Sequence, residues 1–305
     1  PPTKLRSSLR AGAYQILYMR VPSHAAVSAT VSASSKKNKS IVNAILRRIS
    51  EEARFNWPNE GTRLSYPEWI IELLIKDLGK KNAFEMLEKM NEAPSVSVRD
   101  DGYRQDLASQ WITDIIGVSK QDLLLDMCSA PGGKATALAT QARKVVACDI
   151  NESRHKLMHE NKTNLSLENL TQVVSDGRSA PFSSHVFDHI LVDAPCSGLG
   201  VLHRRADSRW RIEEGDVKNL AKLQIDLLDS SVRLLKDGGV LSYSVCTVTN
   251  QETVDVVKSL ENLHPNLIPE KLFHERWRKI GNGLQILPQD FGTDGMSMFQ
   301  WKLAN

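Results

Sequence analysis

The sequence has few cysteines, and no two of them lie close together along the chain. The four are Cys128, Cys148, Cys196 and Cys246, and no pair has the Cys-x-x-Cys spacing typical of zinc sites. Four thiols in 305 residues are also too sparse for a disulfide framework. We therefore expect no metal, and free thiols in a reducing, cytoplasmic compartment. For each thiol, a small buried hydrophobic residue is the alternative to a functional role.

Long apolar segments are also lacking. No run approaches the roughly 20 consecutive apolar residues that a membrane helix needs, and the N-terminus lacks the apolar segment of a secretory signal. The chain begins with Pro1-Pro2 rather than Met, so we expect further residues upstream. These features predict a monomeric globular protein with no membrane partner.

Acidic residues are missing from residues 1–50, which carry nine basic residues and no Asp or Glu. The rest of the chain has 39 − 9 = 30 basic and 36 acidic residues, a formal charge of −6. Such a basic segment is typical of an element that binds a polyanion. A solvated helical surface is the alternative that charge alone leaves open.

The chain up to about residue 116 has mostly helical periodicity. Apolar residues at three- and four-residue spacing predict helices over 9–18, 42–49, 66–78, 82–91 and 105–116. The polar run Ser32–Ser40 predicts a loop, and Pro94–Tyr103 predicts a short strand-like stretch. This region is therefore expected to be helical, with a small α+β part at its end.

From about residue 120, short apolar runs alternate with amphipathic segments. The runs predict strands over 123–126, 144–149, 171–176, 189–193 and 240–246. The segments between and after them predict helices over 134–142, 153–165, 214–235 and 251–260. This alternation is typical of a doubly wound α/β fold, a parallel sheet with helices on both faces.

Acids and thiols follow the predicted strands at their carboxyl ends, where ligands bind in open parallel sheets. These residues are Asp126, Asp149, Asp176, Asp193, Cys196 and Cys246. A single Asp at a strand end is usually a helix cap or turn residue. Several at one edge of a sheet indicate a site.

The glycine-rich loop Cys128–Lys134 fits neither common phosphate-binding motif. A P-loop would need Gly in place of Cys128 and Ser or Thr in place of Ala135, and a dinucleotide fingerprint would need three spaced glycines. Close backbone approach to a small nucleoside ligand remains. Asp149 is then expected to bind ribose hydroxyls and Asp176 the adenine amino group. S-adenosylmethionine combines adenosine with methyl donation, so we expect it as the cofactor.

The two remaining thiols suit methylation of cytosine at C5. This carbon becomes nucleophilic only after a thiolate has added to C6. We expect Cys246 to attack C6, Asp193 to contact N3 if it is protonated or hydrogen-bonded, and Cys196 to act at C5 and help eliminate the enzyme.

Three sequence blocks resemble the RNA cytosine-C5 methyltransferases: Asp126–Lys134, Asp193–Gly198 and Tyr243–Thr247. The resemblance implies that Cys246 is the nucleophile and Cys196 the release cysteine. DNA cytosine-C5 enzymes differ, because they attack with the Cys of their Pro-Cys motif. The cofactor-binding residues implied here are Cys128, Ser129, Ala130, Pro131, Gly132, Gly133, Lys134, Asp149, Asp176 and Asp193.

The N-terminal part resembles the NusB-like RNA-binding domain in the stretches Arg10–Tyr18, Val21–Val27 and Val42–Arg48. Its fusion to such a catalytic domain is similar to the Sun/Fmu (RsmB) family of small-subunit rRNA methyltransferases. The resemblance implies a Rossmann-like methyltransferase domain at 105–305. A NusB-like domain at 1–60 and a small connecting α+β domain at 61–104 precede it.

The implied partner is RNA, either 16S rRNA or a small-subunit assembly intermediate. The chain departs from the family in its short stretches at 32–39 and 99–105, and in Val245, where the family usually has Thr. Two alternatives stay open: the same chemistry on tRNA, and a non-catalytic RNA-binding assembly factor. The segment His203–Arg205 contacts RNA phosphate or forms a solvated loop.

Overall fold

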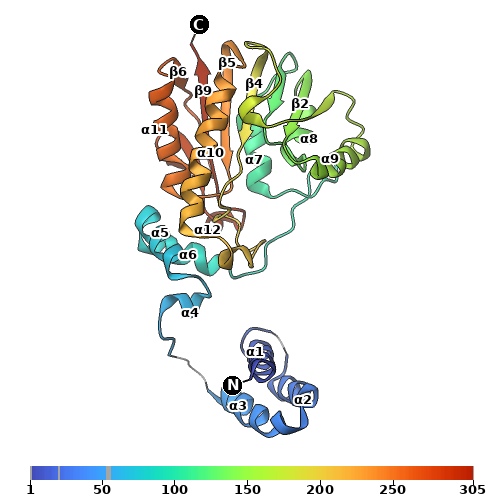
Figure 1. Cartoon of the computed structure of the whole chain (residues 1–305), viewed down its shortest axis with the longest axis vertical. Coiled ribbons are helices and arrows are strands. Elements are labelled where there is room, and N and C mark those ends of the chain that lie inside the picture. The colour runs from blue at the N-terminus through green and yellow to red at the C-terminus, as the bar shows by residue number, and fades with distance from the viewer. Residues whose placement is uncertain (1, 20, 53–55, 305) are drawn as a thin grey trace. The chain divides into compact units, whose positions relative to one another are not determined.

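The computed structural model describes residues 2–19, 21–52 and 56–304, and the chain divides into two compact units, Pro1–Asn59 and Glu60–Asn305. Figure 1 shows the course of the chain in each unit. The boundary expected between residues 104 and 105 stays a prediction, because this division separates only the first 59 residues.

The N-terminal unit is built from three helices, α1 (Thr3–Tyr18), α2 (Ser23–Ala33) and α3 (Lys39–Glu51). They enclose a small core of Leu5, Val27, Val42 and Leu46. At Gly12 of α1 a β-carbon would lie 2.4 Å from a methyl carbon of Leu46, so the glycine allows α1 and α3 to approach closely.

The loop expected over Ser32–Ser40 is largely wrong. Helix α2 continues to Ala33, a 3-10 turn (Lys36–Asn38) follows, and α3 begins at Lys39. The polar side chains do not end α2, because their hydroxyls are satisfied within it. Thr30 Oγ1 donates to Ala26 O and Ser34 Oγ donates to Thr30 O, both at 2.8 Å.

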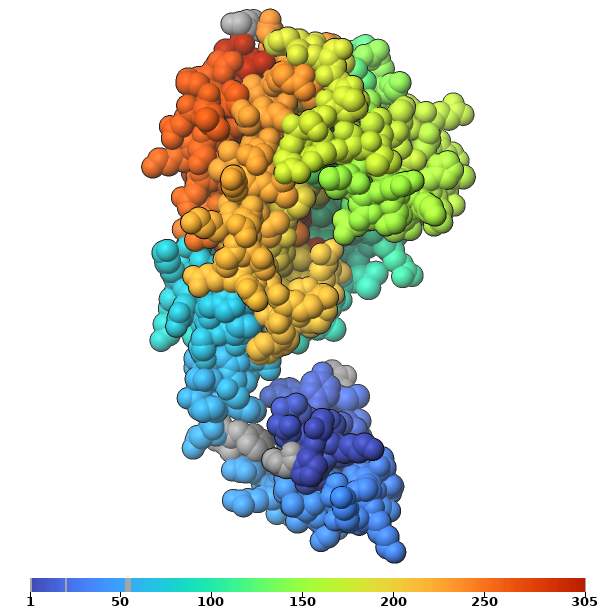
Figure 2. Space-filling view, in the orientation of Figure 1, coloured from blue at the N-terminus to red at the C-terminus, as the bar shows by residue number. Residues whose placement is uncertain are grey.

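Helices α4 (Glu60–Leu64), α5 (Glu68–Leu78) and α6 (Lys80–Lys89) open the second unit. Pro67 is the N-cap residue of α5, and Gly79 separates α5 from α6 at φ +78°. The apolar faces of these helices share a core with Leu199, Val217 and Leu287 of the sheet-bearing part. In Figure 2 their cyan surface meets the orange surface of the later chain. The strand-like stretch 94–103 forms a single bridge, Val98 with Arg104.

A nine-stranded sheet forms the centre of the second unit, in the order β3-β2-β1-β4-β5-β9-β8-β7, with β6 paired to β9. Its parallel half, which confirms the predicted fold, consists of β1 (Leu123–Asp126), β2 (Lys144–Asp149), β3 (Leu170–Val174), β4 (Phe187–Asp193) and β5 (Leu235–Val245). The antiparallel half was not predicted. It consists of β6 (Leu267–Pro269), β7 (Arg278–Ile280), β8 (Gly283–Ile286) and β9 (Met296–Leu303).

Helices cover both faces of the sheet (Figure 1). Alternation along β1 shows the two sides: Leu124 packs with α7 (Leu107–Ile116), α8 (Gly133–Ala139) and α9 (Glu152–Asn164), and Leu125 with α10 (Glu214–Val232) and α11 (Val254–Leu263). The short helix α12 (Pro288–Phe291) precedes β9. Among the described residues, no helix is both long and apolar enough to cross a membrane.

Arg209 links the helical segment to the sheet-bearing part of the unit. Its buried guanidinium donates to Ser65 O at 3.1 Å and to Asn91 Oδ1 at 2.9 Å, and it lies 3.9 Å from the centre of the Tyr66 ring. Arg209→Ala should therefore lower the free energy of unfolding by about 3 kcal/mol in urea titrations. The matched control is Arg211→Ala, whose side chain is 71% exposed. Equal stability of the two variants would contradict the assignment.

Candidate active site

The carboxyl ends of the parallel strands bring the predicted acids and thiols to one edge of the sheet. Asp126 ends β1, Asp149 ends β2 and Asp193 ends β4, while Cys246 directly follows β5. The strand order reverses between β1 and β4, which are paired neighbours. That position is where open α/β sheets bind their ligands.

The two cysteines of this edge lie in contact. Cys196 Sγ and Cys246 Sγ are 3.0 Å apart, and both residues are partly exposed with free thiols. The hydrogen bond to Cys246 raises the pKa of Cys196 well above its usual value, and burial adds to this effect. The two thiols thus form one hydrogen-bonded pair at the carboxyl edge of the sheet.

Two glycines allow a close backbone crossing next to the two cysteines. Gly200 N donates to Cys246 O at 3.1 Å, and Gly295 N donates to Gly200 O at 2.9 Å. A β-carbon on Gly200 would lie 2.0 Å from Gly295 O, so no larger residue fits this crossing. Sequence reasoning missed both glycines, because they follow no recognised loop motif.

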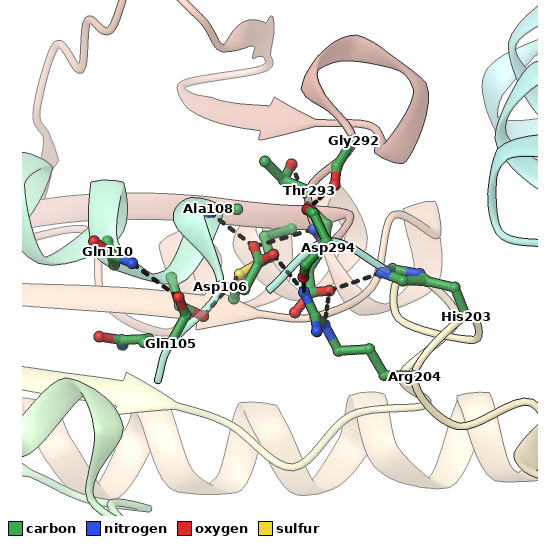
Figure 3. A network of polar contacts seen from close by, with 12 residues as sticks. Gln105, Asp106, Ala108, Gln110, His203, Arg204, Gly292, Thr293 and Asp294 are labelled. Atoms are coloured by element: carbon green, nitrogen blue, oxygen red, sulfur yellow. Dashed lines mark hydrogen bonds and ion pairs between the residues drawn. The ribbon is translucent and has the colours of Figure 1, made fainter. Parts of the chain in front are cut away.

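Figure 3 shows the ionic network behind that crossing. Arg204 lies between two carboxylates, with Nε 2.6 Å from Asp294 Oδ1 and Nη2 2.7 Å from Asp106 Oδ2. The nearly buried ring of His203 approaches the same oxygen of Asp294 at 3.0 Å. His203 and Arg204 connect the loop after Cys196 to the loop before β9. Arg204 and Arg205 remain exposed, so contact of this segment with RNA phosphate stays a prediction.

A buried ion pair lies beside the cysteines. Lys134 Nζ is 2.7 Å from Asp193 Oδ2, and Ser244 Oγ donates to Asp193 Oδ1 at 2.6 Å. Burial on its own would lower the pKa of Lys134, but attraction to Asp193 outweighs it and the pKa is raised. Lys134 therefore stays cationic. Asp193 accepts both hydrogen bonds, one on each carboxylate oxygen, so it is hydrogen-bonded as one of the two alternatives from the sequence expected.

The glycine-rich loop folds back on the end of β2. Ala130 N donates to Asp149 Oδ2 at 3.0 Å, and Ser129 Oγ donates to Cys148 O at 3.0 Å. Gly132 has φ +102°, and a β-carbon there would lie 2.9 Å from Met158 Cγ. The expected residues Cys128–Lys134 thus form one turn from β1 into α8, held against Asp149.

Asp126 was recognised as a strand end but not as a site residue. Both of its carboxylate oxygens are buried without a hydrogen bond of ordinary geometry, although the Cys128 N–H lies close by. Burial raises the pKa of Asp126 well above its usual value, and repulsion from Asp193 adds to it. Asp126 thus interacts with two further acids, Asp149 and Asp193, and with a single cation, Lys134. The excess of acidic side chains over cations fits a ligand with positive groups, such as the ammonium and sulfonium of S-adenosylmethionine.

Asp176 lies two residues beyond β3, at the same edge, and caps a 3-10 turn (Gly177–Ser179). Its carboxylate pairs with Arg178 Nη2 at 2.6 Å, and hydrogen bonds from Arg178 lower the pKa of Asp176. An adenine amino group would have to use lone pairs that Arg178 leaves free.

Arg99 and Tyr103, in the stretch that is shorter than in the family, lie against the glycine-rich loop. Arg99 Nη1 donates to Gly133 O at 2.7 Å, and the Arg99 guanidinium stacks 4.6 Å from the Tyr103 ring centre. Sequence reasoning missed both residues. Their only signal is an Arg and a Tyr near a turn, which is too common to indicate a contact.

Comparison with known proteins identifies the families that this chain resembles. The family described as "16S rRNA methyltransferase RsmB/F" matches residues 114–303, and the NusB family matches residues 2–51. "Ribosomal RNA small subunit methyltransferase B" of Pasteurella multocida is 28% identical over 350 residues, covering 94% of this chain and 77% of the relative. The Yersinia pseudotuberculosis protein of the same name is 27% identical, with 93% and 79% covered. An alignment longer than the chain means that the relatives carry residues it lacks.

Solved structures give the same fold. The crystal structure of PH0851 has a TM-score of 0.77 at 21% identity and covers 97% of this chain and 82% of its own. NSun6 from Pyrococcus horikoshii, solved with SFG, has a TM-score of 0.61 at 26% identity, with 67% and 53% covered. The family match covers well over half of the sequence. The chain therefore belongs to the RsmB/F family of 16S rRNA methyltransferases, with S-adenosylmethionine as its cofactor.

Proposed function

We propose that this protein transfers a methyl group from S-adenosylmethionine to C5 of a cytosine in 16S rRNA, with Cys246 as nucleophile and Cys196 as the residue that releases the product. The contact of the two sulfurs, 3.0 Å apart after neighbouring strands, carries the proposal. A pair of structural thiols would not need to lie at the carboxyl edge of the sheet beside an ion pair.

The first step is addition of the Cys246 thiolate to C6. A new C–S bond forms, and the electron pair of the C5–C6 double bond moves to C5, which becomes the nucleophile. Bound S-adenosylmethionine would supply the electrophilic methyl group. Cys196, whose pKa is raised chiefly by the hydrogen bond to Cys246, keeps the shared proton during this step.

Release requires removal of the C5 proton and cleavage of the bond between Cys246 and C6. Once Cys246 is bonded to carbon, it no longer offers Cys196 an anionic acceptor, so the main cause of the raised pKa of Cys196 disappears. Cys196 then loses its own proton to water and takes the proton from C5. The electron pair of the C5–H bond re-forms the double bond, and Cys246 leaves as the thiolate.

Asp193 and Lys134 would orient the base. An ionised Asp193, held by Lys134 and Ser244, accepts a hydrogen bond from the exocyclic amino group of cytosine. It accepts one from N3 only once N3 carries a proton. Lys134 in turn offsets the negative charge that develops on the ring after Cys246 has added.

The cofactor is assigned to the residues expected from the sequence, with Asp126 added for its unpartnered carboxylate. The loop Cys128–Lys134 supplies backbone groups, Asp149 the ribose contact, and Asp176 the adenine contact. Asp193, at the end of β4, would contribute to the side of the site nearest the cysteines. The carboxylate excess described above supports this assignment, because a cationic ligand neutralises it.

RNA binding is assigned to the N-terminal unit. It matches the NusB family and carries the basic residues of the first 50 positions without an acidic one. We interpret residues 1–60 as the NusB-like domain, 61–104 as the connecting segment and 105–305 as the methyltransferase domain of a cytoplasmic monomer. The target cytosine must leave its stack to reach Cys246.

Cys246→Ala should abolish methyl transfer, because no other group replaces the attacking sulfur. The measurement is incorporation of radiolabelled methyl from S-adenosylmethionine into 16S rRNA, with circular dichroism as a check on folding. Cys148→Ala is the matched control, since Cys148 is a fully buried thiol in β2 with no role in the mechanism. Full methylation by the Cys246 variant would refute the mechanism.

Cys196→Ala should trap the reaction after methyl transfer, because the C5 proton stays in place and Cys246 cannot leave. A covalent protein–RNA adduct is then expected as a slow band on a denaturing gel. The Cys246→Ala variant and a double variant should give no such band. An adduct that survives in the double variant would contradict the assigned roles.

The same chemistry on tRNA is the competing substrate. Separated rRNA and tRNA, each incubated with radiolabelled donor, decide between the two; label in 16S rRNA supports the proposal. A non-catalytic assembly factor is the alternative of another class. Calorimetry with S-adenosylmethionine separates it, because failure to bind the donor would favour it.

A further inference from the structure

Glu252 is a completely buried carboxylate at the end of the 3-10 turn Asn250–Glu252, six residues after Cys246. Among the described residues, no Lys, Arg or His forms an ion pair with it. A carboxylate in such a place is costly unless hydrogen bonds compensate it fully. No strand contact of the sheet requires an acid at this position. The hydrogen-bond partners of Glu252 therefore indicate its role.

Every polar contact of this carboxylate comes from a donor. Oε1 accepts from Ser197 N at 2.7 Å and from Gln224 Nε2 at 3.1 Å. Oε2 accepts from Ser197 Oγ at 2.5 Å and from Thr249 Oγ1 at 3.2 Å. An ionised carboxylate satisfies all of these donors, because it only accepts. Two of the four come from the residue that follows Cys196.

The same carboxylate connects the loops of both cysteines. Ser197 follows Cys196, and Thr247 follows Cys246; their hydroxyl oxygens are 3.0 Å apart. On the other side of Cys196, Gln224 Nε2 also donates to Pro195 O at 2.9 Å. Both neighbours of Cys196 along the chain are thus fixed to one buried pair, Gln224 and Glu252, and that pair also contacts the loop of Cys246.

We propose that Glu252 is a positioning residue for the release step, which holds Cys196 against Cys246 through the loop residues on both sides of Cys196. This inference rests on the proposed cytosine-C5 mechanism. It goes beyond that mechanism, since it assigns the division of labour between the two thiols to a residue that touches neither substrate nor cofactor.

The electrostatics agree with the geometry. Cys196 faces three titratable groups among the described residues, Cys246, Glu252 and Tyr243. The hydrogen bond to Cys246, burial and the Cys246 charge raise its pKa most, and the negative charge of Glu252 raises it further. The carboxylate therefore has two effects on Cys196: it fixes the loop that carries this residue, and its charge raises the pKa of the thiol.

Glu252→Gln tests the proposal, because it keeps the shape but removes the charge and turns one acceptor into a donor. The pH dependence of iodoacetamide alkylation, followed by mass spectrometry of the Cys196 peptide, should shift to lower pH in the variant. With 16S rRNA and S-adenosylmethionine, steady-state turnover should fall about 10- to 100-fold. The adduct that Cys196→Ala traps should accumulate in part, while calorimetric binding of S-adenosylmethionine stays unchanged.

The matched control is Glu261→Gln on α11, where the carboxylate accepts from Trp301 Nε1 at 2.9 Å and touches neither cysteine loop. It should change neither the alkylation profile nor turnover. An unshifted Cys196 profile, or a loss of turnover without adduct, in the Glu252 variant would overturn the inference. The Cys196→Ala variant run beside it separates the cases. If that variant traps an adduct, only the role of Glu252 fails; if it does not, the proposed function fails with it.

Discussion

The pairing of β4 with β5 is the constraint on which the site depends. Their parallel register places Asp193 opposite Ser244, so the loops that leave the two strands begin side by side. Each loop reaches a cysteine within a few residues, which brings the sulfurs into contact. Insertion of one residue before Cys196 or Cys246 would separate them, because the strands themselves are fixed by their hydrogen bonds on both sides.

Further contacts hold the loops of Cys196 and Cys246 in place beyond the ends of β4 and β5. Backbone hydrogen bonds connect Cys246 to Gly200 and Gly200 to Gly295, and the Arg204 ion pairs hold the far end of this path. Glu252 holds the near end, beside Cys196. The proposed mechanism needs Cys196 close to C5 while Cys246 is bonded to C6, so a chemistry that uses two thiols in sequence also needs this rigid surround.

The sequence predicts the parallel half of the sheet well, because each of its strands is a short apolar run followed by an acid or a thiol. It predicts the antiparallel half poorly. Strands β7 and β8 are short and β9 mixes Gln300 and Lys302 with its apolar residues, so neither an apolar run nor strict alternation marks them. The polar run Ser32–Ser40 misled for the opposite reason: its composition is that of a loop, but only Ser34 and Ser35 are non-helical between the end of α2 and the 3-10 turn that leads into α3.

The residues of the candidate site also differ in how well the sequence predicts them. Cys196, Cys246 and Asp193 lie in recognisable motifs, and their residue types indicate the proposed chemistry. Glu252 and Arg204 do not, because their importance comes from partners far away in the sequence: Ser197 for the one, Asp106 and Asp294 for the other. A single buried acid or arginine has no local pattern, and only the folded chain reveals what it satisfies.

Charge then explains why the two tasks of the protein need different surfaces. The strand ends gather Asp126, Asp149 and Asp193 around Lys134, and this negative field suits a cationic cofactor but repels a phosphate backbone. A cytosine base is neutral and can enter such a site only if its phosphates stay outside. The N-terminal unit has the opposite field, with cations and no acids in its first 50 residues. In the proposed function, the N-terminal unit would bind the anionic RNA backbone and the strand ends the cationic cofactor, two ligands of opposite charge that a single field of either sign would not hold.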